Sequence, residues 1–562
     1  MTLRRFLVSL LSLLVLATAG CADTDPETGR GEPGGTVVIA SAGDADFLLP
    51  PLITGVTGKQ VVDQLYEKLA EIGPDLNTVG DDGFTPRLAE SWEWADDSLS
   101  ITFQLDPEAR WHDGRPVRAG DVRFSHRFYT DSAVASAAAT RLSSVDSVTI
   151  PDSVTAVVWF ARRSPEQFFD FVYELLVLPE HVLGGIPAAE LRSSPVAREP
   201  VGSGPFRFVR WEPGVRIEIV ADTGFHRGRP SLDRVIWRIS SDPSTAVTQL
   251  LTGAADFYEV IPPPAIPEIA ADSMLQLIQY PALAYGYLAF NFRDPDNLRR
   301  PHPLFSHVGV RRALSMAVDR EALVASVFDS LGRVARGPFA SALVRESEMP
   351  RQIPFDPAAA ATLLDSLGWR DANGDGIRER NGTTLAFDML VPTSSRIRMS
   401  MAVLLQEQLR RVGARVELET VEFTTFLARQ AGKQFDAALG AWNLDPSFSG
   451  LRQNWMTEGQ EGTGTSNFGS YSGAGFDALV DSALVAPTPG ERSRLKAAAF
   501  QAIVDDAPAI WLYEPLLVAA AHRRIDITGM RPDAWWAGIP EWSIAADRRI
   551  ARDSIGLRAR PD

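Results

Sequence analysis

Apolar and polar positions follow two different periods along the chain. Apolar residues spaced three and four apart predict amphipathic helices, and strict alternation predicts half-buried strands. Asp319 has a side chain suited to an N-cap, so we expect a helix over 320–328. The helical stripes are Val62-Leu65-Tyr66-Leu69, Val310-Ala313-Leu314-Ala317 and Met401-Leu404-Leu405-Leu409-Val412, and the alternating segments are 101–105, 215–219 and 416–418. Helices and strands are therefore expected throughout the body of the protein.

The first apolar run has the layout of a secretory signal. Arg4 and Arg5 precede the apolar residues 6–16, and small residues occupy 17–20. The run is too short for a mature membrane span, which needs roughly 20 residues. Cys21 follows directly, and this arrangement resembles a bacterial lipobox. The resemblance implies a signal peptide over 1–20 and lipidation of Cys21; the alternative is a plain signal peptide with an incidental cysteine.

Composition limits the partners of the mature chain. Residues 21–34 combine Cys21 with a Gly-, Pro- and acid-rich stretch that is expected to be a flexible tether. The 562 residues exceed the usual size of a single core and predict two or more lobes. The net charge of −16 argues against nucleic-acid binding and against electrostatic attachment to anionic lipid. Because Cys21 is the single cysteine, an intramolecular disulfide is excluded.

Several segments have the composition of turns and closing contacts. Asp113 and Gly114 before Pro116 predict a turn, and Asp121 is suited to cap a helix. The run 202–205, Gly-Ser-Gly-Pro, predicts a chain reversal or a crossing without side-chain bulk. The aromatic residues near the C-terminus, Trp535, Trp536 and Trp542, predict packing of a closing segment, and residues 551–562 are expected to be a frayed tail.

Together, several stretches resemble the family 5 extracellular solute-binding proteins, which include the peptide- and nickel-type receptors of ABC importers. The likeness runs from about residue 35 to about residue 542, and Trp111 stands where the family pattern has Phe. The matching stretches are 88–92 (LAESW), 101–103, 111–125 (WHDGRPVRAGDVRFS), 201–206 (VGSGPF), 211–214, 228–233, 242–243, 250–253, 290–291 and 308–320.

The resemblance implies an α/β fold. It is the two-lobed clamp of the periplasmic-binding proteins, type II, class C, with an extra third domain. Ligand would lie in the cleft, and hinge closure would enclose it. The implied parts are lobe I at 35–82, 201–295 and 525–550, the extra domain at 83–200, lobe II at 296–524 and a tail at 551–562.

The resemblance also implies ligand residues in the segment 441–447, Ala-Trp-Asn-Leu-Asp-Pro-Ser. In peptide-binding members an Asp four positions before the Pro captures the α-ammonium group of the ligand, but here Trp442 occupies that position. Capture would need Asp445 in its place. Trp442 is expected either to stack on ligand or to fill the core. Asn443 and Asp445 are expected either to contact ligand or to cap a turn.

On the other side of the cleft, Tyr285, Tyr287 and Asn291 lie on a strand that leads toward the second lobe. Alternation would point all three side chains to one face. A tyrosine at a cleft can pack against a ligand and also hydrogen-bond it. The alternative is that these are ordinary half-buried strand residues.

Motifs for catalysis and metal binding are weak. The seven histidines are scattered, and neither His-Glu-x-x-His nor Gly-x-Ser-x-Gly occurs, so neither an enzyme activity nor a cofactor nor a metal site is expected. Residues 371–376 resemble the first half of a calcium loop. The twelfth position is Gly382 where a bidentate Glu is needed, which favours a structural turn over weak Ca²⁺ binding.

We therefore expect an exported, monomeric, lipid-anchored receptor on the periplasmic or cell-surface face of a membrane. It would bind an oligopeptide or peptide-like solute and deliver it to the permease subunits of an ABC importer. The alternatives are a receptor for a non-peptide solute, such as a nickel chelate, haem or an oligosaccharide, and a sensory or chaperone clamp without transport.

Overall fold

The computed structural model describes residues 33–460 and 466–554. Cys21 and the expected signal and tether up to residue 32 lie outside these ranges. Helices and strands are mixed along the chain, as the two periods predict, but the stripe at 62–69 is helical only up to the end of α1 (Val56–Leu65). Helix α9 (Arg320–Phe328) begins after Asp319, whose carboxylate accepts a hydrogen bond from the Ala322 backbone N–H, so the predicted N-cap is confirmed.

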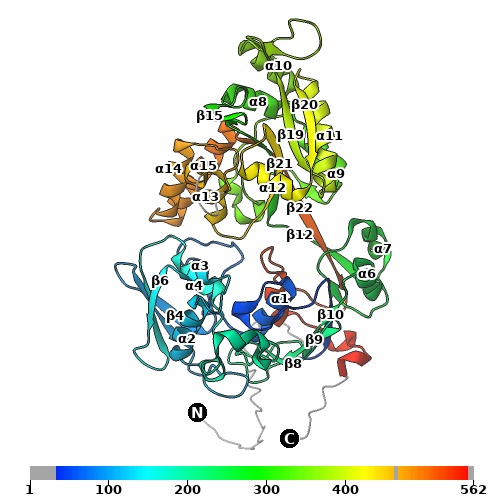
Figure 1. The fold of residues 1–562 in the computed structure, drawn as a ribbon. Helices are drawn as coiled ribbons and strands as arrows, with labels where there is room; N and C mark the ends of the chain where they lie inside the picture. Colours follow the sequence, from blue (N-terminus) through cyan, green and yellow to red (C-terminus); the bar gives the residue numbers. More distant parts are fainter. Residues whose placement is uncertain (1–32, 461–465, 555–562) are drawn as a thin grey trace, which may run out of the picture.

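The first lobe is built on one half of a large mixed sheet (Figure 1). Helix α1 covers one face of this half, and α6 and α7 cover the other. Both faces are therefore buried, which explains why β1 reads as a continuous apolar run instead of an alternating one. The elements are β1 (Thr36–Ser41), β8 (Phe206–Glu212), β9 (Arg216–Ala221), β10 (Arg234–Ile239), β11 (Phe257–Tyr258), β12 (Leu275–Pro281), α1 (Val56–Leu65), α6 (Pro243–Leu251) and α7 (Ile266–Ala271).

The second lobe contains the other half of the sheet. Helices α8 to α11 pack on one face, and α13 to α15 pack on the other. The elements of the sheet and its helices are β13 (Ala284–Phe290), β19 (Ala386–Pro392), β20 (Arg415–Val421), β21 (Ala437–Asn443), α8 (Val308–Met316), α9, α10 (Pro357–Ser366), α11 (Arg396–Arg410), α12 (Phe423–Ala431), α13 (Ser449–Trp455), α14 (Ala474–Leu484) and α15 (Pro489–Asp506). Short pieces are β14 (Arg293–Asp294), β15 (Asn297–Pro301), β16 (Gly332–Arg333), β17 (Glu379–Arg380) and β18 (Thr383–Thr384).

An extra domain inserted between β3 and β8 has its own four-stranded sheet, in the order β4-β5-β7-β6. Helix α2 begins earlier than expected. Asp121 is not its N-cap but lies in the first turn, where its carboxylate accepts the Arg118 backbone N–H at 2.8 Å. The short strands β2 (Ala70–Glu71) and β3 (Thr85–Pro86) precede this domain. Its own elements are β4 (Ala89–Trp94), β5 (Ser100–Leu105), β6 (Val145–Thr149), β7 (Thr155–Phe160), α2 (Ala119–Thr130), α3 (Ala139–Leu142), α4 (Gln167–Glu174) and α5 (Glu180–Leu183).

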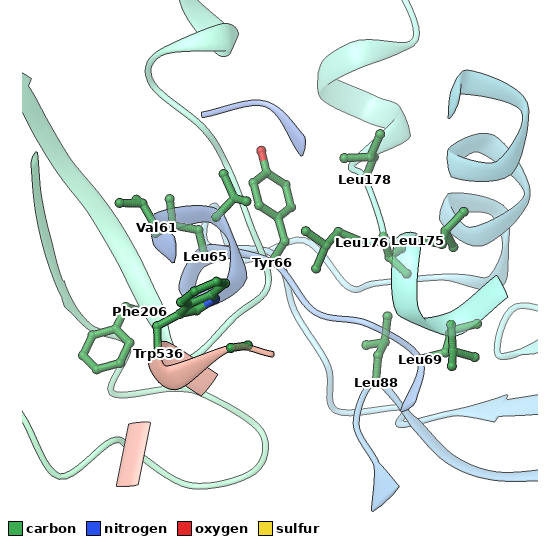
Figure 2. Packing of buried hydrophobic residues seen from close by; sticks show 14 of the residues in the cluster. Val61, Leu65, Tyr66, Leu69, Leu88, Leu175, Leu176, Leu178, Phe206 and Trp536 are labelled. Carbon is green, nitrogen blue, oxygen red and sulfur yellow. The ribbon is translucent and has the colours of Figure 1, made fainter. Parts of the chain in front are cut away.

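The extra domain and the first lobe share one hydrophobic core. Figure 2 shows Leu65 and Tyr66 at the end of α1 packed between Leu176, which follows α4, and Trp536 near the C-terminus. The Gly-Ser-Gly-Pro run passes directly over this point. A Cβ atom on Gly202 would lie 1.7 Å from the Leu65 carbonyl oxygen, so only glycine fits. The extra domain is therefore fixed to the first lobe by continuous packing.

The long strand β22 (Ala509–His522) belongs to both lobes. Its first part pairs with β13, and the part from Leu516 onward pairs with β12. Strand β13 also pairs with β21 along its whole length, so it lies in the second lobe. The chain thus crosses between the lobes at 281–284 and near 514–516, earlier than the boundaries after 295 and 524 that the resemblance implied. Hydrogen bonding, which the sequence likeness does not report, decides which sheet a strand joins.

A buried charge network attaches the C-terminal residues to the first lobe. Arg524 donates to the carboxylate of Asp256 at 2.8 Å and to that of Asp553 at 3.0 Å, and all three side chains are at most 4% exposed. Asp553 also accepts the Thr36 backbone N–H at the start of β1. Residues 551–554 are therefore packed, contrary to the expected frayed tail. The stretch has no apolar period because charge pairing, not apolar contact, holds it in place.

Replacing Arg524 with Met should lower the free energy of unfolding by roughly 3 kcal/mol, because buried carboxylates would lose their main cation. Chemical unfolding of both proteins measures the difference. The matched control is Arg299→Met on β15, an exposed arginine, for which we expect a change below about 0.5 kcal/mol. Equal losses in the two variants would contradict this role for Arg524.

A second buried pair joins the first lobe to the extra domain. His226 contacts Glu67 at 3.0 Å through Nε2 and Asp106 at 2.7 Å through Nδ1, and the imidazole is 2% exposed. Burial alone would lower the pKa of His226, but the hydrogen bonds and negative charges of Glu67 and Asp106 outweigh it and raise the pKa above 6.5. The imidazolium therefore stabilises the folded state.

Because the pKa of His226 is raised on folding, its contribution is complete below pH 6.5 and is lost as the pH rises through the folded-state pKa. The free energy of unfolding should fall over this window more in the wild type than in His226→Gln, which does not titrate there. Urea unfolding across mildly acidic to mildly alkaline pH tests this. Parallel pH profiles for the two proteins would rule out the linkage.

Candidate ligand-binding site

The candidate site lies where β21 ends, on the face of the second lobe that is turned toward the extra domain. Figure 1 shows α13 to α15 above α3 and α4 across the space between the lobes. The predicted segment 441–447 begins within β21 and continues past the end of this strand at Asn443. Asp445 pairs with Arg141 on α3, and Glu166 beside α4 accepts hydrogen bonds at 2.9 Å from Ser447 Oγ and from the Phe448 backbone N–H. The segment 442–448 therefore joins the second lobe to the extra domain.

Trp442 is half-buried at the edge of this site. It lies directly opposite Tyr285 on β13 and stacks on Phe468, with ring centroids 5.9 Å apart. One part of the indole is thus fixed by packing, and another part is open to solvent. Trp442 therefore packs on the second lobe and keeps part of its side chain exposed, and its stacking on a ligand stays a prediction.

Tyr285 and Tyr287 lie on β13, the strand that pairs with the Trp442 strand β21. They are 1% and 4% exposed, and the Tyr285 hydroxyl accepts a hydrogen bond from Trp455 Nε1 at 2.7 Å. Burial raises the pKa of both phenols above their ordinary range. The Tyr287 ring covers Gly440, where a Cβ atom would come within 2.7 Å of the ring. The two tyrosines are placed to shape the lobe beneath the site, and their predicted contact with ligand stays a prediction.

Asn291 lies away from the other candidates. It follows the end of β13, six residues beyond Tyr285, so the two are roughly 20 Å apart along the strand. Its side-chain amide is fully buried and donates to the carbonyls of Lys433 and Phe435 at 3.0 and 2.8 Å. These bonds fix the turn before β21. The structure does not bring Asn291 together with Trp442, and we leave it out of the site proposed below.

Asn443 and Asp445 differ in their surroundings. Asn443 is exposed at the last position of β21. Asp445 accepts the Ser447 backbone N–H at 3.0 Å, so it does form the turn that its sequence context predicts. Its other oxygen receives the Arg141 guanidinium, and its side chain remains 41% exposed. Asp445 therefore combines a turn, an interdomain ion pair and an open surface.

An apolar pocket adjoins Asp445 in the second lobe. Lys496 lies at its rim, paired with the buried Glu348 at 2.9 Å and placed over the Phe448 ring at 5.3 Å. The apolar lining is formed mainly by Phe339, Leu343, Leu444, Phe448, Leu451 and Phe500. Such a pocket can accept an apolar group of a ligand.

Carboxylates of the extra domain crowd the opposite side of the site. Burial raises the pKa of Glu166. The pKa of Asp170 rises to about 7, chiefly through burial and then through the negative charges of Glu166, Glu174 and Asp445, with Arg141 opposing the rise. Around neutral pH, Asp170 is therefore only partly ionised, which lowers the repulsion within this group.

A second pocket lies between the first lobe and the extra domain, beside α1. Two of its basic groups have partners within the protein: Arg531 contacts Glu71 at 2.9 Å, and Lys68 lies over the Tyr173 ring at 4.4 Å. Sequence reasoning missed this pocket together with Arg141 and Glu166. These residues belong to no shared motif, and no local pattern connects them with residues three hundred positions away.

The calcium-like loop is a turn in the structure. The Asp371 carboxylate accepts the backbone N–H groups of Gly374 and Gly376 at 2.7 and 2.9 Å, and Asp375 accepts that of Ile377. In the described part of the chain, no group of three or more His, Cys, Asp or Glu residues is placed to hold a metal ion. Within residues 33–460 and 466–554, no helix has the length and apolar character to cross a membrane.

Two α/β lobes joined by a shared strand, with a further domain packed on the first lobe, have the architecture of a two-lobed clamp. The model of the bacterial extracellular solute-binding proteins, family 5 (middle), matches residues 83–463, which is more than half of the chain. The protein belongs to this family, as the sequence resemblance indicated.

Similar proteins differ in what they bind. The chain is 25% identical over 557 residues to the oligopeptide-binding protein AppA of Bacillus subtilis (strain 168), covering 96% of this chain and 98% of AppA. The structure of AppA with a nonapeptide aligns with a TM-score of 0.64 over 92% of this chain and all of AppA. Heme-binding protein A of Haemophilus influenzae is 26% identical over 484 residues, covering 82% and 83% of the two chains. The unliganded open form of the murein tripeptide-binding protein MppA shares the fold, with a TM-score of 0.76 at 19% identity over 92% and 98% of the chains.

Replacing Trp442 with Ala should weaken ligand binding by about tenfold while leaving the body folded, because the exposed part of the indole would be lost from the site wall. Titration with a pooled set of synthetic peptides, followed by native mass spectrometry, measures the loss. Trp159→Ala in the extra domain is the control, since that indole is 43% exposed and lies on β7. Unchanged affinity in a folded Trp442→Ala protein would remove Trp442 from the site.

Proposed function

We propose that this protein is the receptor of an ABC importer, that it binds oligopeptides or peptide-like solutes between its lobes, and that it delivers them to a permease. The observation that carries the proposal is the segment 442–448, which links the second lobe to the extra domain and adjoins an apolar pocket, with Asn443 and part of Trp442 exposed. The similarity of the whole chain to AppA, whose structure contains a nonapeptide, supports a peptide as the ligand class.

The proposed ligand contacts are Trp442, Asn443 and Asp445 from the second lobe, with Tyr285 and Tyr287 behind them. Peptide main chain would be held by backbone groups and polar side chains, and bridging water would adapt the site to different side chains. Closure is favoured because only the closed state contacts ligand from both sides. No covalent step is involved.

We also propose that Cys21 carries the lipid that attaches the receptor to the membrane after removal of residues 1–20. The basic, apolar and small-residue order before Cys21 supports this. Attachment would rest on the acyl chains, each methylene contributing about 0.8 kcal/mol. Residues up to 34 would give the body freedom to meet a permease, and the receptor would act as a monomer.

The second candidate function is a receptor for a haem or another non-peptide solute, which the similarity to Heme-binding protein A supports. The two functions differ in the mass that the protein retains during purification. That difference makes native mass spectrometry the direct test.

Native mass spectrometry of the full chain, extracted from the membrane fraction in mild detergent, should show a ladder of peptide masses that is lost on partial unfolding. The ladder is expected because bridging water would let the site accept different side chains. A protein that arrives empty is titrated with the pooled synthetic peptides.

A single non-peptide mass would move the ligand to the second candidate, and failure to bind any pooled peptide would contradict the peptide proposal. The same preparation tests the lipid anchor, because the N-terminal fragment should begin at Cys21 and carry acyl chains. Its internal control is Cys21→Ser, which should release the protein from the membrane fraction.

A further inference from the structure

Both charged side chains on the apolar pocket of the second lobe already have partners within the chain. Lys496 is paired with Glu348, which is only 4% exposed. Asp445 is paired with Arg141, which comes from the extra domain, 304 positions away in the sequence. A ligand that enters this pocket therefore meets an apolar lining bordered by two neutralised charges.

Arg141 is held from more than one side. Its Nε lies 3.4 Å from Glu174, its guanidinium lies over the Phe169 ring at 5.7 Å, and the side chain is 26% exposed. Burial alone would lower the pKa of Arg141, but the charges of Asp445 and Glu174 outweigh it and raise the pKa. The guanidinium is thus held against Asp445 and stays charged throughout the physiological pH range.

The neighbouring carboxylates do not replace Asp445 as an open anionic site. Glu166 accepts hydrogen bonds from the Thr78 hydroxyl, the Ser447 hydroxyl and the Phe448 backbone N–H. Asp170 is partly protonated near neutral pH because its pKa rises to about 7. Among the carboxylates in and beside the segment 442–448, that of Asp445 is partly exposed, and it is paired with Arg141.

We infer that Arg141 is a specificity-determining residue, and that by occupying Asp445 it makes this wall of the cleft receive an uncharged, apolar end of the solute, such as the blocked terminus of an N-acylated peptide. A ligand ammonium group would have to displace a guanidinium that is tethered in place, and the tether gives the internal partner a high effective concentration. The planar guanidinium also matches a carboxylate better than an ammonium does. This inference rests on the proposed peptide-binding function.

The test compares pooled synthetic peptides that are supplied in pairs, each sequence once with a free and once with an N-acetylated terminus. Binding of each pair is measured by native mass spectrometry and by titration calorimetry. The wild type should bind the acetylated form at least as tightly as the free form. Arg141→Met exposes Asp445 and should shift the preference toward the free amine by about tenfold.

Three further variants make the result specific. Arg141→Lys keeps a tethered cation and should retain the wild-type preference. Combining Arg141→Met with Asp445→Asn should abolish the shift. Arg162→Met removes an exposed arginine of the same domain and should change nothing. Thermal unfolding of each variant shows that the comparison is made between folded proteins.

A wild type that prefers free amines at least tenfold, with no change in Arg141→Met, would overturn the inference while leaving peptide binding intact. Absence of binding to every peptide, free or acetylated, would instead overturn the proposed function and the inference with it. A shift in Arg141→Met that persists in the double variant would also overturn the inference, because Asp445 would not be its cause.

Discussion

The structure depends on one strand that serves two sheets. Strand β22 hydrogen-bonds to β13 in the second lobe and to β12 and β11 in the first, so its backbone connects the two cores. At the crossing, Glu514 is 2% exposed and accepts the Ser341 backbone N–H at 2.9 Å. Because β22 is paired in both lobes, it can bend where it crosses between them, but the lobes stay connected. The site at the end of β21 lies beside this crossing, and relative rotation of the lobes changes its width.

The extra domain gives this clamp a third wall. Because it shares a core with the first lobe, it follows that lobe when the hinge bends, and its contacts with Asp445 and Phe448 lie on the opposite, second lobe. Closure of the cleft therefore forms or breaks polar bonds between domains in addition to bonds with ligand.

Charge pairing recurs wherever distant parts of the chain meet. Arg524 joins the C-terminal residues to β1, His226 joins the first lobe to the extra domain, and Arg141 joins the extra domain to the second lobe. A chain with a net charge of −16 has more carboxylates than cations, so the placement of its cations decides which carboxylates can be buried. The same placement decides which carboxylate remains open to a ligand.

The local elements, the family and the candidate segment 441–447 could be predicted from the sequence alone. The N-cap residue Asp319 predicted α9 and alternation predicted β9, because helix and strand formation depends on neighbours within a few positions. The likeness located Trp442 and Asp445 but could not distinguish a turn from a ligand contact. The tertiary structure was needed to show that Asp445 forms an ion pair with Arg141, that the Asn291 side chain donates to backbone carbonyls, and that Asp553 is buried. Such pairs join residues hundreds of positions apart, and a single sequence contains no local period from which their proximity can be read.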